Sequence, residues 1–179
     1  MSLRGADAAE NELVQKLNLC CGQDKKDGYL NCDIENSDEN IDVSLGKLPF
    51  PDNSFSEIIF KHAIEHFTPP QVDKILPEIQ RILRPSGFVD IFAPELALAC
   101  EDYLSGTNKY PNCINPIERL YGNGSSVEHV HKSGYTAKLS RPNNIHNLLT
   151  DRWGFSKSEN IQKIDNFLNH YYSFSNFLS

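Results

Sequence analysis

The sequence predicts an α/β fold with a mostly parallel central sheet. Short apolar runs alternate with turn residues throughout residues 13–94, as strands do when loops and helices separate them. One of these runs, Ile58-Ile59-Phe60, has no polar position, which is typical of a strand that is buried on both faces. A stretch with helical periodicity and then another apolar run follow it. The chain has 179 residues, enough for one well-buried domain.

Five strands are expected in the first half of the chain, and turn residues close several of them. The first strand ends at Gly22, the second is stopped by Asp33, and the fifth is ended by Pro94. The expected strands span Lys16–Cys20, Tyr29–Cys32, Asn40–Leu45, Ser56–Lys61 and Phe88–Phe92.

A helix is predicted over residues 71–84. Pro77 lies inside it and should kink it, because proline cannot donate the helical hydrogen bond. Pro85-Ser86-Gly87 then predicts a turn before the fifth strand. The apolar positions of the helix have the spacing of one helical face, and they are Val72, Ile75, Leu76, Ile79, Ile82 and Leu83.

The second half of the chain has a different amino-acid composition. Residues 105–145 are rich in Asn, Gly, Ser, Pro and His, which predicts a long irregular connection. A helix is expected over 136–150 and a sixth strand over 155–164, whereas 167–178 fit either a strand or an amphipathic helix. Residues 1–12 read as a disordered leader or a cloning remnant, which leaves residues 13–179 as a single domain.

Composition narrows the possible partners. The net charge of −7 argues against a whole-surface electrostatic grip on nucleic acid or on an anionic membrane. No apolar stretch approaches the roughly 20 residues that span a bilayer, and no signal-peptide pattern opens the chain. The five cysteines therefore indicate reduced thiols in a cytoplasmic protein.

Two residues stand where a ligand would bind in such a fold. Ligands of open α/β sheets lie beyond the carboxyl ends of the strands. Gly22 would let the backbone approach a ligand closely, although many glycines in this place only make a turn. Asp33 could accept hydrogen bonds from both hydroxyls of a ribose, or it could be an ordinary acid in a turn.

Four motifs in order add a more specific signal. They are LNLCCG at 17–22, the acid Asp33, LPFPDNSF at 48–55 followed by HAIEH at 62–66, and EIQRILRPSG at 78–87. Together they resemble the class I S-adenosylmethionine-dependent methyltransferases, and above all the small type-11 group, over Lys16–Pro94. The segment HVHKSGYT at 129–136 is similar to the H-x-x-x-[FY]-[ST] element of that group. The resemblance implies a Rossmann-like methyltransferase fold: a mostly parallel central sheet flanked by helices, in a single domain.

The resemblance also implies roles. Residues 13–94 would bind S-adenosylmethionine and release S-adenosylhomocysteine, and residues 95–179 would form the acceptor side, with 105–135 as pocket and lid. The acceptor would be a small molecule methylated on oxygen or nitrogen, with His131 or His62 as the base; the protein would be a monomer or homodimer that binds no nucleic acid. The implied cofactor contacts are Asn18, Cys20, Cys21 and Gly22 at the methionine part, Asp33 at the ribose, Ile34, Ser44 and Leu45 around the adenine, and Lys61 and His62 near the methyl group.

Three positions depart from the family pattern and keep a second hypothesis open. Cys20 stands where the family has a glycine, and a cysteine fits there only if the backbone does not need a positive φ. Asp24 replaces another frequent glycine, and Ser44 stands where an adenine-contacting acid is common. The alternative is a non-catalytic binding or regulatory module with the same fold.

Metal binding is not expected from the sequence. His62-x-x-Glu65-His66 matches the inverted zinc-peptidase pattern, but His62 should lie at a strand-to-helix junction, away from the helical face that the pattern requires. Cys20, Cys21 and Cys32 lack the usual spacing of zinc ligands. His129, His131 and Tyr135 could serve acid–base chemistry or simply fasten their loop.

Overall fold

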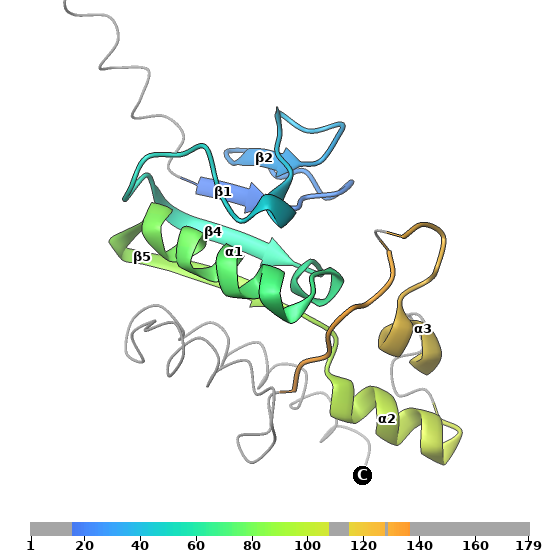
Figure 1. Cartoon of the computed structure of the whole chain (residues 1–179). Helices are drawn as coiled ribbons and strands as arrows, with labels where there is room; N and C mark the ends of the chain where they lie inside the picture. The colour runs from blue at the N-terminus through green and yellow to red at the C-terminus, as the bar shows by residue number, and fades with distance from the viewer. Residues whose placement is uncertain (1–15, 108–114, 128, 137–179) are drawn as a thin grey trace, which may run out of the picture.

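The computed structural model describes residues 16–107, 115–127 and 129–136, and these contain a five-stranded parallel sheet (Figure 1). The strands lie in the order β3-β2-β1-β4-β5. The chain runs outward from β1 to β3 and then returns to β4 on the other side of β1, so the topological switch point lies between β1 and β4. The predicted α/β fold with a parallel sheet is confirmed. The strands are β1 Lys16–Leu19, β2 Leu30–Asp33, β3 Glu39–Asn40, β4 Phe55–Lys61 and β5 Leu83–Phe92.

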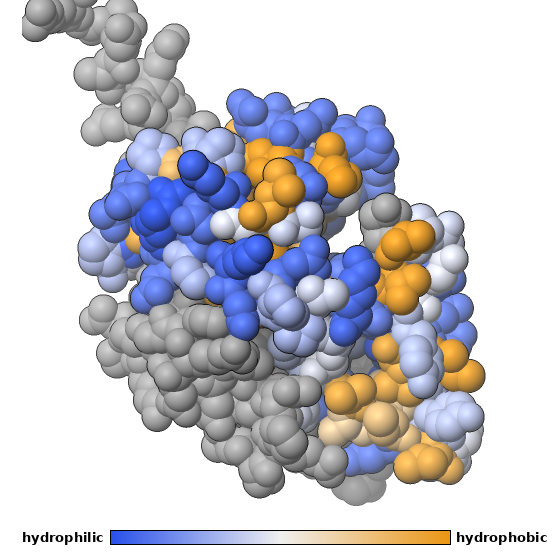
Figure 2. Space-filling model, viewed as in Figure 1, coloured by the Kyte–Doolittle hydropathy of each residue, from blue (hydrophilic) through white to orange (hydrophobic). Residues whose placement is uncertain are grey.

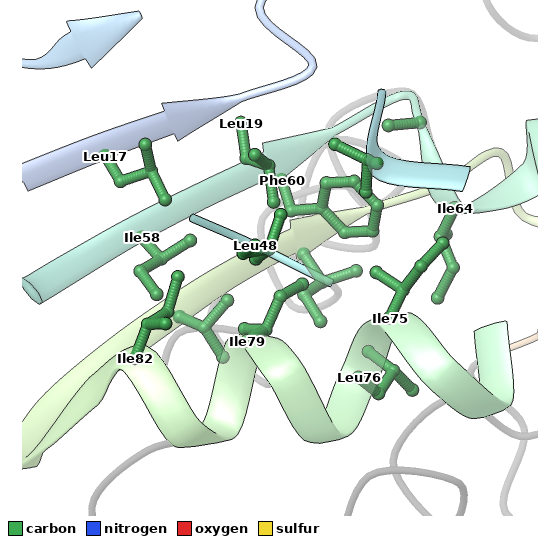
Figure 3. Packing of buried hydrophobic residues seen from close by; sticks show 14 of the residues in the cluster. Leu17, Leu19, Leu48, Ile58, Phe60, Ile64, Ile75, Leu76, Ile79 and Ile82 are labelled. Atoms are coloured by element: carbon green, nitrogen blue, oxygen red, sulfur yellow. The ribbon is translucent and has the colours of Figure 1, made fainter. Parts of the chain in front are cut away.

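The helix α1, Pro69–Ile82, covers one face of this sheet (Figure 1). Its buried residues are Val72, Ile75, Leu76, Ile79 and Ile82, which confirms the predicted apolar face. Side chains of β1 and β4 point toward this face and close the core, as Figure 3 shows for Leu17, Ile58 and Phe60. The central strands are therefore held by burial of apolar side chains, each worth about 1.5–3 kcal/mol when fully buried.

The ends of α1 differ from the prediction. The helix begins two residues earlier, at Pro69, because a proline at the first helical position loses no hydrogen bond. The amide of Thr68 donates to Oε1 of Gln71 at 2.9 Å and so closes this end. The helix continues through Pro77 and ends at Ile82, since Leu83 is already extended and opens β5.

The third predicted strand is mostly wrong. Only Glu39–Asn40 pair with β2, and a 3₁₀ helix, η2 Val43–Leu45, takes the remainder. The carboxylate of Asp42 accepts a hydrogen bond from the amide of Ser44 at 3.0 Å and starts this turn, and Gly46 ends it. A local side-chain cap therefore outcompetes strand pairing here.

The turn predicted at Pro85-Ser86-Gly87 is a bulge inside β5. Leu83 pairs with Phe55 and Phe88 pairs with Glu57, so four residues oppose one. A Cβ on Gly87 would lie 2.9 Å from the carbonyl oxygen of Ser56. Only glycine allows the bulge to pack this closely against β4.

Beyond β5 the structure contains two helices that the sequence does not predict: α2, Leu96–Ser105, and α3, Pro116–Tyr121. The second interrupts the connection that was expected to be irregular. A buried ion pair joins them, with Arg119 Nη2 2.6 Å from Asp102 Oδ2. In the described part of the chain no helix is long and apolar enough to cross a membrane. The elements predicted for 136–150, 155–164 and 167–178, apart from Thr136, lie outside the described residues, as does the 1–12 segment.

Candidate functional site

The loop after β1 lies at the switch point of the sheet. Cys20 and Gly22 both adopt left-handed backbone conformations, with φ of 55° and 51°. A cysteine was expected to fit at this position only without a positive φ, but the φ of Cys20 is positive. This conformation is strained for a residue with a Cβ. Among the residues that the structure describes, none has an atom within 4 Å of where a Cβ on Gly22 would be, so the backbone here is open to an incoming group.

Asp33 lies directly beside this loop. Its Oδ2 accepts a hydrogen bond from the amide of Gly22 at 2.7 Å, and its Oδ1 accepts one from the amide of Ile34, also at 2.7 Å. A carboxylate oxygen has capacity for two hydrogen bonds. Both oxygens of Asp33 thus keep an acceptor site at the carboxyl edge of the sheet.

Asn18 is buried and holds the loop after β1 through hydrogen bonds. Its Nδ2 donates to the carbonyl oxygen of Asp24 at 2.8 Å and to Oδ1 of Asn31 at 2.9 Å. Lys26 lies 3.0 Å from the carboxylate of Asp24 and offsets its negative charge next to the loop. Cys21 is anchored as well, because its amide donates to the carbonyl of Cys32 at 3.0 Å.

Two exposed apolar side chains flank the same edge. Ile34 follows Asp33 directly and is 57% exposed, and Leu45 in η2 is 72% exposed. The amide of Ile41 donates to the carbonyl of Asp33 at 2.7 Å, which holds the chain that leads into η2 next to the end of β2. Figure 2 shows apolar surface over this region and an open notch between it and the loop that follows α3. Ser44 lies beside Leu45, with its amide held by Asp42.

The end of β4 carries the two residues expected near a transferred group. The ammonium of Lys61 lies 4.3 Å from the centre of the Phe92 ring, so it is held over β5. His62 has a φ of 48°, and its amide donates to the carbonyl of Phe92 at 2.8 Å. The His62 side chain is 68% exposed, and its Nδ1 lies 3.8 Å from Oε1 of Glu65.

A family model described as a methyltransferase domain matches residues 6–91, slightly less than half of the chain. This part of the chain is similar to the methyltransferase-domain family. Among solved structures, the PH0226 protein from Pyrococcus horikoshii OT3 is 25% identical, with a TM-score of 0.39 over 52% of this chain and 55% of that one. A SAM-dependent methyltransferase from Archaeoglobus fulgidus is 17% identical, with a TM-score of 0.41 over 60% and 57%.

The chain thus spans little more than half the length of both proteins. No curated protein matches the sequence significantly.

A second group of polar side chains surrounds Glu65 in the 3₁₀ helix η3, Ile64–His66. Glu65 is 2% exposed, and burial raises its pKa to about 8. His66 and His131 lie close by, with ring centres 4.9 Å apart. Burial, and for His66 also the neighbouring His131, lowers the pKa of both rings and keeps them neutral at neutral pH.

The remaining candidates of the 129–136 segment hold that segment in place. Nδ1 of His129 lies 2.7 Å from the hydroxyl of Ser125 in its own loop. Tyr135 is buried in the core, and its carbonyl accepts a hydrogen bond from the amide of Leu96 at 2.9 Å. These contacts support the interpretation that His129 and Tyr135 hold their loop in place.

Sequence reasoning missed the environment of Glu65. The HAIEH motif contains this residue, but nothing in the motif indicates that its carboxylate is buried or that His131 lies beside it. The Asp102–Arg119 pair had no sequence signal either, because the two residues are brought together only by the unpredicted α2 and α3.

Proposed function

We propose that the protein is an S-adenosylmethionine-dependent methyltransferase that acts on an oxygen or nitrogen of a small molecule. The observation that carries this proposal is the position of the Asp33 carboxylate, which lies beside the open Gly22 loop at the switch point of the sheet. An acid beside an open glycine loop at this point matches what a nucleoside ligand requires.

The residues at this edge fit the parts of S-adenosylmethionine. Asp33 would accept hydrogen bonds from the ribose hydroxyls through its remaining acceptor sites. Ile34 and Leu45 would cover the adenine, which would give their exposed side chains an apolar partner. The Cys20–Gly22 loop would lie beside the methionine part, with Asn18 positioning it from below. When bound, the cofactor supplies a methyl group activated by a sulfonium.

The protein's own contribution would be alignment and proton removal. Holding donor and acceptor in line in a site without water can supply much of the rate enhancement. Of the two histidines proposed as base, His62 is favoured because its side chain is 68% exposed at the end of β4. His131 is half-buried, and its Nδ1 donates to the carbonyl of Arg119 at 3.1 Å.

One observation favours a second candidate, a non-catalytic module with this fold. Cys20 holds a left-handed conformation that a glycine would adopt without strain, and its side chain adds bulk next to the loop. A chain that no longer binds the cofactor would tolerate such a change. Direct measurement of binding separates the two candidates.

The deciding experiment is calorimetric titration of S-adenosylmethionine and S-adenosylhomocysteine into the wild type, Asp33→Ala and Asp27→Ala. Asp27 is an exposed acid of the same loop and provides a control with the same change of charge. We expect micromolar binding by the wild type and Asp27→Ala. Asp33→Ala should bind at least tenfold more weakly, since each hydrogen bond to a charged acceptor contributes about 1.5–3 kcal/mol. No binding by the wild type at millimolar ligand would support the non-catalytic module.

We further propose that the protein works in the cytoplasm as a monomer or homodimer, with residues 13–94 binding the cofactor and residues 95–179 facing the acceptor. The free thiols of the described Cys20, Cys21, Cys32 and Cys100 support a reducing compartment.

A further inference from the structure

Three potential metal ligands meet beyond the carboxyl end of β4. Glu65 and His66 come from η3, and His131 comes from the segment 129–136. One ligand atom of each lies within 4.8 Å of the other two. Ligands of one tetrahedral zinc ion stand about 3.4 Å apart, because each bond measures roughly 2.0–2.2 Å. Side-chain rotations that shorten the separations by about an ångström would therefore bring all three onto one ion.

Both histidines already have the tautomer that a metal site requires. Nδ1 of His66 lies 3.4 Å from the carbonyl oxygen of Val130, and Nδ1 of His131 lies 3.1 Å from that of Arg119. A carbonyl oxygen can only accept, so each Nδ1 carries the proton and each Nε2 keeps its lone pair. Metal-binding histidines are typically oriented by such a hydrogen bond from the second ring nitrogen.

Glu65 supplies the anionic ligand. Its Oε2 is buried and has no hydrogen-bond partner among the described residues. An unpartnered buried carboxylate is unfavourable unless a cation or a proton satisfies it. The backbone of Glu65 is fixed nearby, because its carbonyl accepts hydrogen bonds from the amides of Lys132 at 2.7 Å and Ser133 at 3.1 Å. The same contacts hold the His131 segment against η3.

We propose that Glu65, His66 and His131 bind a divalent transition-metal ion of the zinc class. Two imidazoles and one carboxylate are a donor set that such ions accept. Three protein ligands leave at least one coordination position open, as in sites that bind a further ligand. That position would take an oxygen donor such as water, in the small cleft that Pro94, Leu96 and Leu120 help to line.

This site differs from the zinc-peptidase pattern considered in the sequence. The third ligand is not His62, which is exposed, but His131 from a distant segment. The metal would occupy Nε2 of His131, which leaves His62 as the base in the proposed methyl transfer. The assignment does not depend on methyl transfer, since it rests on these three side chains alone.

The test uses Co²⁺, which reports its ligands by visible absorption. Titrated into the full reduced chain, Co²⁺ should bind with one equivalent and give d–d bands of nitrogen and oxygen ligation. The paramagnetic proton NMR spectrum of the wild type should then show two strongly shifted exchangeable signals, one from each Nδ1–H. No binding, or a thiolate-to-cobalt charge-transfer band, would overturn the assignment.

Variants identify the ligands. Glu65→Gln and His131→Gln should bind Co²⁺ at least tenfold more weakly. The control is His129→Gln. His129 is exposed, and within the described residues its ring nitrogen pairs with the hydroxyls of Ser125 and Ser126 of its own loop. Equal affinity of His131→Gln and the wild type would overturn the proposal. If a variant does not fold, as circular dichroism will show, the two shifted signals of the wild type decide the question. Neither measurement involves S-adenosylmethionine, so the failure of methyl transfer and the failure of metal binding are distinguishable.

Discussion

The two ends of β4 are built in opposite ways. The loop before β4, residues 48–54, is locked onto α1 by Arg81, whereas the loops after β1, β2 and β4 keep open backbone and exposed side chains. Both ends carry motifs that resemble the methyltransferase family. The difference indicates that LPFPDNSF and RILRPSG serve the fold, whereas LNLCCG and Asp33 would bind the ligand in the proposed function.

Arg81 makes the amino end rigid through a fork of hydrogen bonds. Its Nη1 donates to the carbonyl of Phe50 and to Oδ1 of Asp52, both at 2.8 Å, and its Nη2 donates to the carbonyl of Leu48 at 3.0 Å. Nε and Nη2 bind the two carboxylate oxygens of Glu78 at 2.8 and 2.7 Å. Two motifs that are about 30 residues apart in the sequence therefore form one unit, and a guanidinium suits it because its donors are fixed in a plane.

The largest effect on stability is expected when this unit is broken. Arg81→Ala should lower the free energy of unfolding by roughly 2–4 kcal/mol, because it leaves Glu78 and two carbonyls without their partner. Urea denaturation measures the loss. The control is Arg84→Ala, which removes a single exposed hydrogen bond to the carbonyl of Asn53 and should cost under about 1 kcal/mol. Weaker binding of S-adenosylmethionine by folded Arg81→Ala would contradict the separation of the two ends.

A second effect follows from the acidity of Glu78. Hydrogen bonds from Arg81, and then the amide of Leu48, lower its pKa from 4.5 to about 2. Because the pKa is lower in the folded state, the stabilisation is complete above about pH 4.5 and is lost as the pH falls toward 2. Relative to Glu78→Gln, the wild type should be more stable by about 1–3 kcal/mol at neutral pH, and by less than half of that near pH 3. A difference in unfolding free energy that does not change with pH would show that the charge of Glu78 is not what stabilises the loop.

The same contrast explains how much the sequence could predict. Val72, Ile75 and Ile79 have the spacing of one helical face in the sequence, and this face is buried in the core. The local sequence pattern was therefore enough to predict the sheet and α1. Asp33 was expected near Gly22 because parallel strands end at the same edge. The approach of His131 to Glu65 depends on α3 and the loop that follows it, whose path no local pattern specifies.

A smaller effect is expected at the carboxyl end of the sheet, on the binding of S-adenosylmethionine. Leu45→Ala should leave the free energy of unfolding within about 0.5 kcal/mol of the wild type, since Leu45 is 72% exposed. It should weaken S-adenosylmethionine about three- to tenfold, because the adenine loses an apolar partner. Leu104→Ala in α2 is the matched control: Leu104 is 83% exposed, and its loss should change neither quantity. Should Leu45→Ala bind the cofactor as tightly as the wild type, η2 would have no part in the adenine pocket.

The smallest effect is that of Cys20→Gly, at the position where the loop after β1 departs from the methyltransferase pattern. The left-handed conformation costs a non-glycine residue about 1 kcal/mol, and the half-buried side chain regains about as much by packing against the core. Cys20→Gly should therefore change the free energy of unfolding by less than about 1 kcal/mol. Cys20→Val keeps the apolar volume but adds a branch that a positive φ disfavours, and it should destabilise by roughly 1–2 kcal/mol. If urea midpoints show Cys20→Val to be as stable as the wild type, the backbone at residue 20 is not left-handed. The strain at this loop would then no longer distinguish the ligand end of β4 from the rigid one.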